Sequence, residues 1–231
     1  MQLAIMQPYF FPYLGYFQLI NAVDTLVVYD NIQFTKKGFI KRNYFLQNRK
    51  PTVFTIPIKK DSCRLDIEQR VVCETFNRRK LLNQIKDAYK NAPYYEPTYN
   101  LFKQAILYDE TNLFLFILNS ILQVCNYLEI ETKFVVSSTI NIDHTLRSQE
   151  KVIAICKQLS TDTYINPIGG IDLYNKDAFQ KENIRLKFLK MKNIQYNQFN
   201  HPFVPNLSIL DVMMFNSKPA IKHLLSQYTL Q

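Results

Sequence analysis

The alternation of apolar and polar stretches along the chain predicts strands that alternate with helices. Short apolar runs closed by polar, proline or glycine residues are typical of buried parallel strands. Five runs fit this pattern, at residues 3–6, 25–29, 133–136, 163–165 and 184–189. Apolar residues spaced three and four apart predict helices at residues 14–20, 81–89, 102–106, 113–128 and 150–159. The order of these elements predicts an α/β fold, Rossmann-like, with a mainly parallel sheet.

Three further helices are expected towards the C-terminus. A short one should follow Gly169-Gly170, and two more should lie in the stretches PNLSILDVMMFN and KPAIKHLLSQY. Asn206 is a candidate cap for the first of these two, and Pro219 lies near the start of the second.

The organisation of the chain predicts one α/β domain over residues 1–231. Its 231 residues, 47% of them hydrophobic, are enough for one sizeable core. Residues 31–75 mix basic, aromatic and β-branched residues and predict an extended basic excursion with hairpins. Residues 76–130 are expected to form a helical insertion.

The predicted strand ends indicate where a ligand would bind. In open parallel sheets, ligands bind outside the carboxyl ends of the strands. The polar junctions there are 7–9, 30–33, 137–139 and 166–170. The substrate-binding candidates from these junctions are Gln7, Gln33, Ser137, Ser138, Asn166, Gly169 and Gly170.

Residues 8–16, here called the aromatic loop, follow the first strand and hold two prolines, a glycine, three tyrosines and two phenylalanines. The prolines and Gly15 predict a rigid loop. Tyr9, Tyr13 and Tyr16 could cover a base or sugar with the ring and bond to it with the hydroxyl. Alternatively, all three pack inward and the loop is a plug over the sheet.

The net charge of +9, from 28 basic and 19 acidic residues, is concentrated in one place. Residues 31–60, here called the basic segment, carry eight basic residues and no acidic one, which predicts an anionic partner or a solvated face. Lys41, Arg42 and Asn43 are the binding candidates, since the planar guanidinium fork suits a diphosphate. Alternate residues of a strand face opposite sides, so the three are not expected to meet one ligand.

Acid and base candidates are few. Asp30 directly follows an apolar strand and could act as a general base or orient a substrate amine, or else serve as a turn residue. His201, in the loop HPFVPN, is the best of three histidines for acid-base catalysis, because His144 is expected to be structural and His223 to lie on the surface. Asp211, near the start of a helix, could simply favour the helix dipole.

Several classes of protein are disfavoured. No His, Cys, Asp and Glu cluster has metal-ligand spacing, and Gly169-Gly170 lacks the G-x-G-x-x-G pattern, so we expect no metal and no dinucleotide cofactor. The four cysteines are expected to be reduced. Neither a membrane span nor a signal peptide is recognisable, which predicts a cytoplasmic protein. The basic segment matches no nucleic-acid-binding module, so a nucleic-acid partner is not favoured.

Two stretches resemble signatures of the nucleotidylyltransferase superfamily. FPYLGYFQLI, at residues 11–20, is similar to the F-x-P-x-H-x-G-H-x-x-L-I pattern, and Val136-Ser137-Ser138-Thr139-Ile140 is similar to I-S-S-T-x-I. The two histidines of the first pattern are replaced here by Tyr13 and Tyr16. Tyrosine cannot supply a cationic imidazolium to a leaving diphosphate, so the resemblance favours the scaffold over the adenylylation chemistry.

A resemblance over nearly the whole chain points to the WbqC-like family of bacteria. It rests on MQPYFFPYLGYFQLI, VDTLVVYDNIQF with the following KGFIKRN, TYINPIGGIDLY and PNLSILDVMMFN. The resemblance implies a place in O-antigen or other surface-polysaccharide synthesis, beside enzymes that make nucleotide-linked amino sugars. It implies no catalytic residue.

Three functions remain open from the sequence. The favoured one is a transferase that moves an acyl or aminoacyl group, from an unknown donor, onto the amine of a nucleotide-linked sugar. The alternatives are a nucleotidylyltransferase-like enzyme and a non-catalytic binding or assembly protein of the same pathway.

Overall fold

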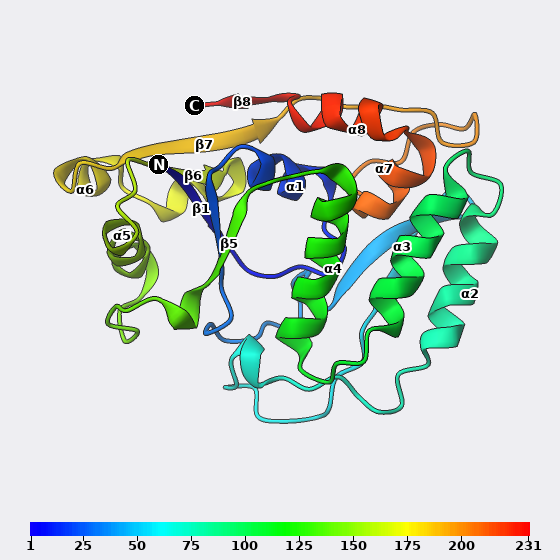
Figure 1. Cartoon of the computed structure of the whole chain (residues 1–231), viewed down its shortest axis with the longest axis horizontal. Helices are drawn as coiled ribbons and strands as arrows, with labels where there is room; N and C mark the ends of the chain where they lie inside the picture. Colours follow the sequence, from blue (N-terminus) through cyan, green and yellow to red (C-terminus); the bar gives the residue numbers. More distant parts are fainter.

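A six-stranded sheet of order β5-β2-β1-β6-β7-β8 lies at the centre of the computed structural model, which describes residues 1–231 (Figure 1). Its strands are β1 (Gln2–Met6), β2 (Thr25–Val28), β5 (Lys133–Val136), β6 (Thr163–Pro167), β7 (Arg185–Met191) and β8 (Tyr228–Leu230). All neighbours pair in parallel except β7 and β8. The mixed α/β class and the mostly parallel sheet expected from the apolar runs are therefore confirmed. The antiparallel strand β8 was not predicted from the sequence, because it is short and partly exposed and gives no apolar run.

Helices cover both faces of this sheet. The helices are α1 (Leu14–Asn21), α2 (Arg78–Tyr89), α3 (Tyr95–Leu107), α4 (Leu113–Leu128), α5 (Ser148–Gln158), α6 (Lys176–Lys181), α7 (Ile209–Phe215) and α8 (Lys218–Leu225). In Figure 1, α5 and α6 lie to the left of β5, whereas α2, α3 and α4 lie to its right. A cluster of 48 buried residues forms the core on the α1, α4 and α8 side, and one of 12 lies under α5 and α6. None of the helices is long and apolar enough to cross a bilayer.

The excursion after β2 forms a separate two-stranded sheet. β3 (Arg42–Gln47) and β4 (Lys50–Thr55) pair antiparallel around a two-residue turn. Both turn residues, Asn48 and Arg49, have positive φ, as the tight hairpin turn with the correct twist requires. The chain returns through a 3₁₀ turn, η1 (Ile67–Gln69), that pairs with the residues leaving β2.

One local expectation needs correction. Asn206 does not cap α7; it lies before the helix with φ of 60°, and the hydroxyl of Ser208 accepts from the amide of Leu210 instead. Gly169 and Gly170 lie inside a 3₁₀ turn, η3 (Ile168–Leu173), and the short helix expected after them is α6 (Lys176–Lys181). Pro219 lies in the first turn of α8, as expected.

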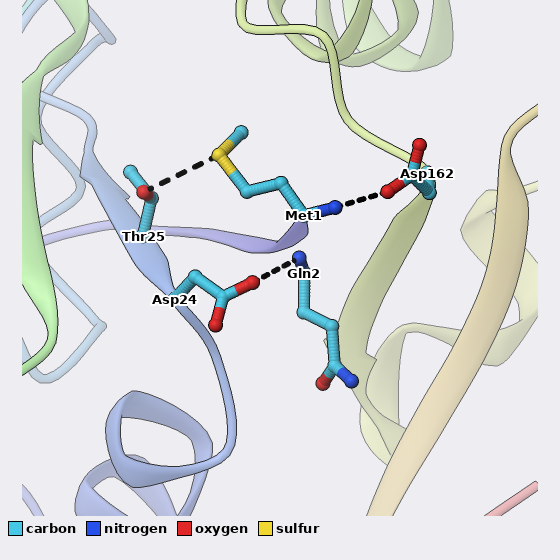
Figure 2. Close-up of polar contacts among 5 residues, drawn as sticks. All are labelled: Met1, Gln2, Asp24, Thr25 and Asp162. Carbon is cyan, nitrogen blue, oxygen red and sulfur yellow. Dashed lines mark hydrogen bonds and ion pairs between the residues drawn. The ribbon is translucent and has the colours of Figure 1, made fainter.

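The amino ends of three central strands are tied to one another (Figure 2). The backbone nitrogen of Met1 pairs with Asp162, the residue before β6. The amide of Gln2 donates to Asp24 Oδ2 at 2.7 Å, and Thr25 Oγ1 donates to Met1 Sδ at 3.7 Å. These contacts fix the strands at the edge of the sheet opposite the one where ligand sites form.

Candidate functional site

Four of the predicted site residues lie at the carboxyl ends of neighbouring parallel strands. Met6, Val28 and Val136 end β1, β2 and β5 in one register, so Gln7 and Ser137 leave the sheet at the same level and Asp30 follows one residue further on. Asn166 is the last residue but one of β6, and it lies at the same end of the sheet because β6 runs parallel to β1. We call this end of the sheet the carboxyl edge.

Asp30 is the most constrained side chain of the carboxyl edge. It is only 3% exposed, and its carboxylate accepts from Ser137 Oγ at 3.0 Å, from the Ser138 amide at 2.9 Å and from Ser138 Oγ. Those donors come from the 3₁₀ turn η2 (Ser137–Thr139), which directly follows β5. The order of two adjacent parallel strands thus brings together residues that are 107 and 108 positions apart.

Asn31 extends this arrangement towards α5. Its amide nitrogen lies 2.9 Å from Nδ1 of His144, whose Nε2 lies 3.0 Å from the carbonyl of Ile140. Because a carbonyl only accepts, Nε2 carries the proton and Nδ1 accepts from Asn31. Both imidazole nitrogens are therefore engaged, in agreement with a structural His144. The ammonium of Lys151, on α5, lies 3.5 Å from two oxygens of Asn31.

Glu68 brings a second carboxylate to Asp30. Its amide donates to the carbonyl of Asp30 at 3.1 Å, which fixes η1 against the end of β2. Burial, and then the negative charge of Asp30, raise the pKa of Glu68. Burial, and then the nearby cation Arg147, lower the pKa of Lys151. Glu68 therefore holds its proton more tightly than an ordinary carboxyl, and Lys151 holds its proton less tightly than an ordinary amine.

Asn166 and Gly170 form the β6 side of the carboxyl edge. Asn166 is buried and accepts from the Tyr164 hydroxyl at 3.2 Å, while its own amide lies 3.2 Å from the Pro167 carbonyl. A Cβ on Gly170 would lie 2.1 Å from Nδ2 of Asn166, so a side chain at this position would displace the Asn166 amide. Gly169 is exposed, with nothing within 4 Å of where its Cβ would be.

The three tyrosines of the aromatic loop have different surroundings. Tyr16 is buried and donates its hydroxyl to the carbonyl of Gln7 at 2.9 Å, so it holds the loop against the end of β1. Tyr9 is half-buried, with its ring 5.7 Å from that of Tyr16 and 5.9 Å from that of Phe39. Tyr13 lines a cavity described below. The loop is thus a plug at Tyr16 and partly accessible at Tyr9 and Tyr13.

The binding candidates in the basic segment also differ in their surroundings. Asn43 is buried and donates to the carbonyls of Phe10 and Phe11, so it holds the backbone of the aromatic loop in place. Arg42 donates to the carbonyl of Lys37 at 2.7 Å. Burial, with the nearby charge of Arg42, lowers the pKa of the Lys41 ammonium. Gln33 donates to the carbonyl of Cys63 at 2.9 Å and remains exposed.

Two cavities lie outside the Asp30 surroundings. One of about 530 Å³ lies at the carboxyl end of β7, where Tyr13, Tyr196 and Phe203 supply rings and Lys190 and Lys192 supply charge. β7 is three strands from β2, a separation of roughly 14 Å at the usual strand spacing. His201 lines a second cavity of about 300 Å³ with Arg49 and Gln198. It is therefore not among the groups that contact Asp30.

A second buried carboxylate, Asp211, lies on α7. It is fully buried and accepts from the hydroxyls of Tyr89 and Tyr196, both at 2.7 Å, and from Nε2 of Gln198 at 2.6 Å. Burial raises the pKa of Asp211, and the three donors oppose the rise. Tyr89 in turn accepts from the amide of Leu46, which ties α7 and α2 to the hairpin.

Sequence reasoning placed Asp30, Ser137 and Ser138 at the carboxyl edge but missed Asn31, Glu68 and Lys151. Asn31 could have been found as the neighbour of Asp30 in the same polar junction. Glu68 gives no signal, because it belongs to an irregular segment whose position depends on backbone pairing with residues 30–34. No group of three or more His, Cys, Asp or Glu side chains comes together in a metal-binding arrangement.

Comparisons with known proteins give a family without an activity. Residues 7–223 match the WbqC-like protein family, so the chain belongs to it. An uncharacterised protein of Mycobacterium tuberculosis (strain ATCC 25618 / H37Rv), Rv1507c, is 24% identical over 218 residues, which cover 93% of each chain. No solved structure matches.

Proposed function

Starting from membership of the WbqC-like family, we propose that this protein is a transferase of bacterial surface-polysaccharide synthesis. It moves an acyl or aminoacyl group onto the amine of a nucleotide-linked amino sugar. The strand order around β1, which runs to β2 on one side and to β6 on the other, supports a Rossmann-like fold with a ligand-binding switch point between β1 and β6. The pathway is the one implied by the family resemblance.

One observation carries the choice of reaction, namely the Asp30–Glu68 pair beside Lys151. A sugar amine is protonated near neutral pH and must lose a proton before it can attack a carbonyl carbon. A carboxylate pair offers an anionic site for the ammonium, and Glu68, with its raised pKa, is the better proton acceptor of a pair in which three donors already occupy Asp30. We therefore assign substrate orientation to Asp30 and proton transfer to Glu68.

The proposed step balances as follows. Glu68 takes one proton from the ammonium, and the freed nitrogen lone pair forms a bond to the donor carbonyl carbon. The bond between that carbon and the leaving atom then breaks, and the leaving group receives a proton from Glu68 or Lys151. The second proton of the nitrogen passes to the residue that gave this proton, which leaves the neutral amide, and one net proton is released to solvent. The partly accessible rings of Tyr9 and Tyr13 are available to cover the base or the sugar.

The test is direct assay of transfer. The protein is incubated with nucleotide-linked amino sugars and a panel of acyl and aminoacyl thioester donors, and the mass gain of the sugar is followed. Glu68→Gln and Asp30→Asn should each reduce the rate by about 10²-fold or more. Glu74→Gln, at an exposed carboxylate that pairs with Lys59, is the matched control and should leave it unchanged.

The assay also separates the alternatives. Release of diphosphate from a nucleoside triphosphate and a sugar phosphate would favour the nucleotidylyltransferase-like reaction. Binding of nucleotide-linked sugars without any turnover would favour the non-catalytic role.

A further inference from the structure

We propose that Arg70 is the anion-binding residue of this protein and that it takes a phosphate or carboxylate group of a ligand. Arg70 directly follows η1, two residues after Glu68. The inference rests on the proposed function only for the identity of the anion, which would be the diphosphate of the nucleotide-linked sugar.

The first step of the argument is that Arg70 is a buried cation without a counter-charge. The residue is only 3% exposed, yet it forms none of the ion pairs of the protein. Its buried Nε has no hydrogen-bond partner. The face of Phe34 is its identified neighbour, with the guanidinium carbon 4.8 Å from the ring centroid.

The second step is that such an arrangement is costly in the free protein. Burying a charge is unfavourable unless it is paired and hydrogen-bonded, and a ring face replaces only part of the lost hydration. Arginine cannot escape by losing its proton, as a buried lysine can. An oxyanion that accepts from the planar fork would satisfy both the charge and the donors.

The third step is that the backbone holds the segment of Arg70 next to the residues that leave β2 at the carboxyl edge. The amides of Ile67 and Glu68 donate to the carbonyls of Ile32 and Asp30, so η1 runs along the chain that leaves β2. The Arg70 carbonyl accepts from the amide of Leu113 at 2.9 Å, which fixes the other end against α4. A ligand amine at Asp30 and a ligand anion at Arg70 would therefore be bound by two chain segments that are hydrogen-bonded to each other.

Arg78 provides a matched comparison. Its guanidinium also lies over aromatic rings, 5.3 Å from the centroid of Phe76 and 5.8 Å from that of Phe116. Unlike Arg70, however, Arg78 donates its Nε to the carbonyl of Ile106 at 2.9 Å and is only half-buried. Replacing Arg70 and Arg78 by the same residue therefore distinguishes an effect on ligand binding from an effect on packing against the rings.

The experiment measures affinity for inorganic diphosphate and, separately, for citrate, by calorimetry on the full chain. Arg70→Met keeps the length and the contact with Phe34 but removes the charge and the donors. We expect it to weaken diphosphate binding about 10- to 100-fold, with an unfolding midpoint equal to or above that of the parent protein. Arg78→Met should lower the midpoint and leave diphosphate binding unchanged. Stronger binding of citrate than of diphosphate would assign the site to a carboxylate ligand.

Three results would overturn the proposal: no diphosphate or citrate binding by the parent protein, unchanged binding by Arg70→Met, or an equal loss of binding in Arg78→Met. If Arg70→Met does not fold, the Arg70 Nε–H resonance of the ¹⁵N-labelled parent protein decides the matter, because it must shift on addition of the anion and remain unshifted otherwise. Failure of transfer with intact diphosphate binding would count against the proposed function alone. Transfer without a role for Arg70 would count against this inference alone.

Discussion

Asp30 and Asp211 are the two buried acidic side chains of the protein, and they differ in what surrounds them. Each accepts three hydrogen bonds. Asp211 meets only neutral donors from α2 and the loop before α7, whereas Asp30 lies at a strand end beside Glu68 and near Lys151. Burial and hydrogen bonding alone therefore do not identify a functional acid. The titratable neighbours of Asp30 at the carboxyl edge are the reason why we propose a functional role for it, whereas Asp211 is better explained as a polar link between elements.

The largest expected effect is on stability, at Asp211. Asp211→Ala leaves two buried hydroxyls and the Gln198 amide without their acceptor, and it opens a small cavity. We expect a loss of about 3–5 kcal/mol in the free energy of unfolding, measured in urea. A loss below about 1 kcal/mol would show that the donors find other partners and that the link is not structural.

The second effect is on function, at Asp30. Asp30→Asn keeps the size of the side chain and should reduce transfer about 10²-fold or more, while the free energy of unfolding falls by no more than about 1 kcal/mol. Asp211→Asn is the matched variant, and its remaining folded fraction should retain normal turnover. Equal losses of turnover in the two variants would remove the distinction between the two acids.

Removing one hydroxyl that donates to each acid should give smaller effects, on stability at Asp211 and on turnover at Asp30. Tyr89→Phe deletes a buried group that joins Asp211 to the Leu46 amide, and we expect it to cost about 1–2 kcal/mol of stability. Ser138→Ala removes one donor from Asp30, and we expect about tenfold slower turnover with stability changed by less than about 0.5 kcal/mol. Both are checked by urea unfolding and the transfer assay on the same preparations.

The smallest effect is a dependence of stability on pH. The folded pKa of Asp211 is raised, so the native state holds this proton above the ordinary carboxyl pKa of about 4, where the unfolded state has lost it. The parent protein should therefore lose stability relative to Asp211→Asn as pH rises through the folded pKa. Hydrogen bonds from Thr145 lower the pKa of Asp143 in the folded protein. The stability of the parent protein relative to Asp143→Asn should therefore change in the opposite direction: Asp143 stabilises the protein above a pH of about 4, and this stabilisation is lost as the pH falls below it.

The sheet could be predicted from the sequence because each parallel strand, buried on both faces, appears as an apolar run. β8 could not, since Tyr228–Leu230 is short and partly exposed at the edge of the sheet. Within the site, Asp30 and Ser137 were accessible to prediction because both follow apolar runs whose ends must lie at one edge. Glu68 and Arg70 were not, because backbone bonds between residues distant in sequence place them.

The tyrosines show the same limit on a smaller scale. The sequence predicted a rigid aromatic loop but could not separate Tyr16, which is buried against Gln7, from Tyr13, which lines a cavity. That difference depends on partners contributed by the C-terminal third of the chain. His201 remains a catalytic candidate by prediction only, in a cavity away from Asp30.

The central position of β1 has a consequence for how the protein is made. β1 leaves the ribosome long before its neighbour β6, since Leu3 pairs with Tyr164, 161 residues later. At a synthesis rate of roughly 5–20 residues per second, the β6 side of β1 stays unpaired for about 8–32 s. We expect nascent chains that stop near residue 150 to bind chaperones and to be cleaved readily by proteases, and chains that extend past β7 to be protected. Protection already complete in the shorter chains would show that the N-terminal half folds without waiting for its central strand to be paired on both sides.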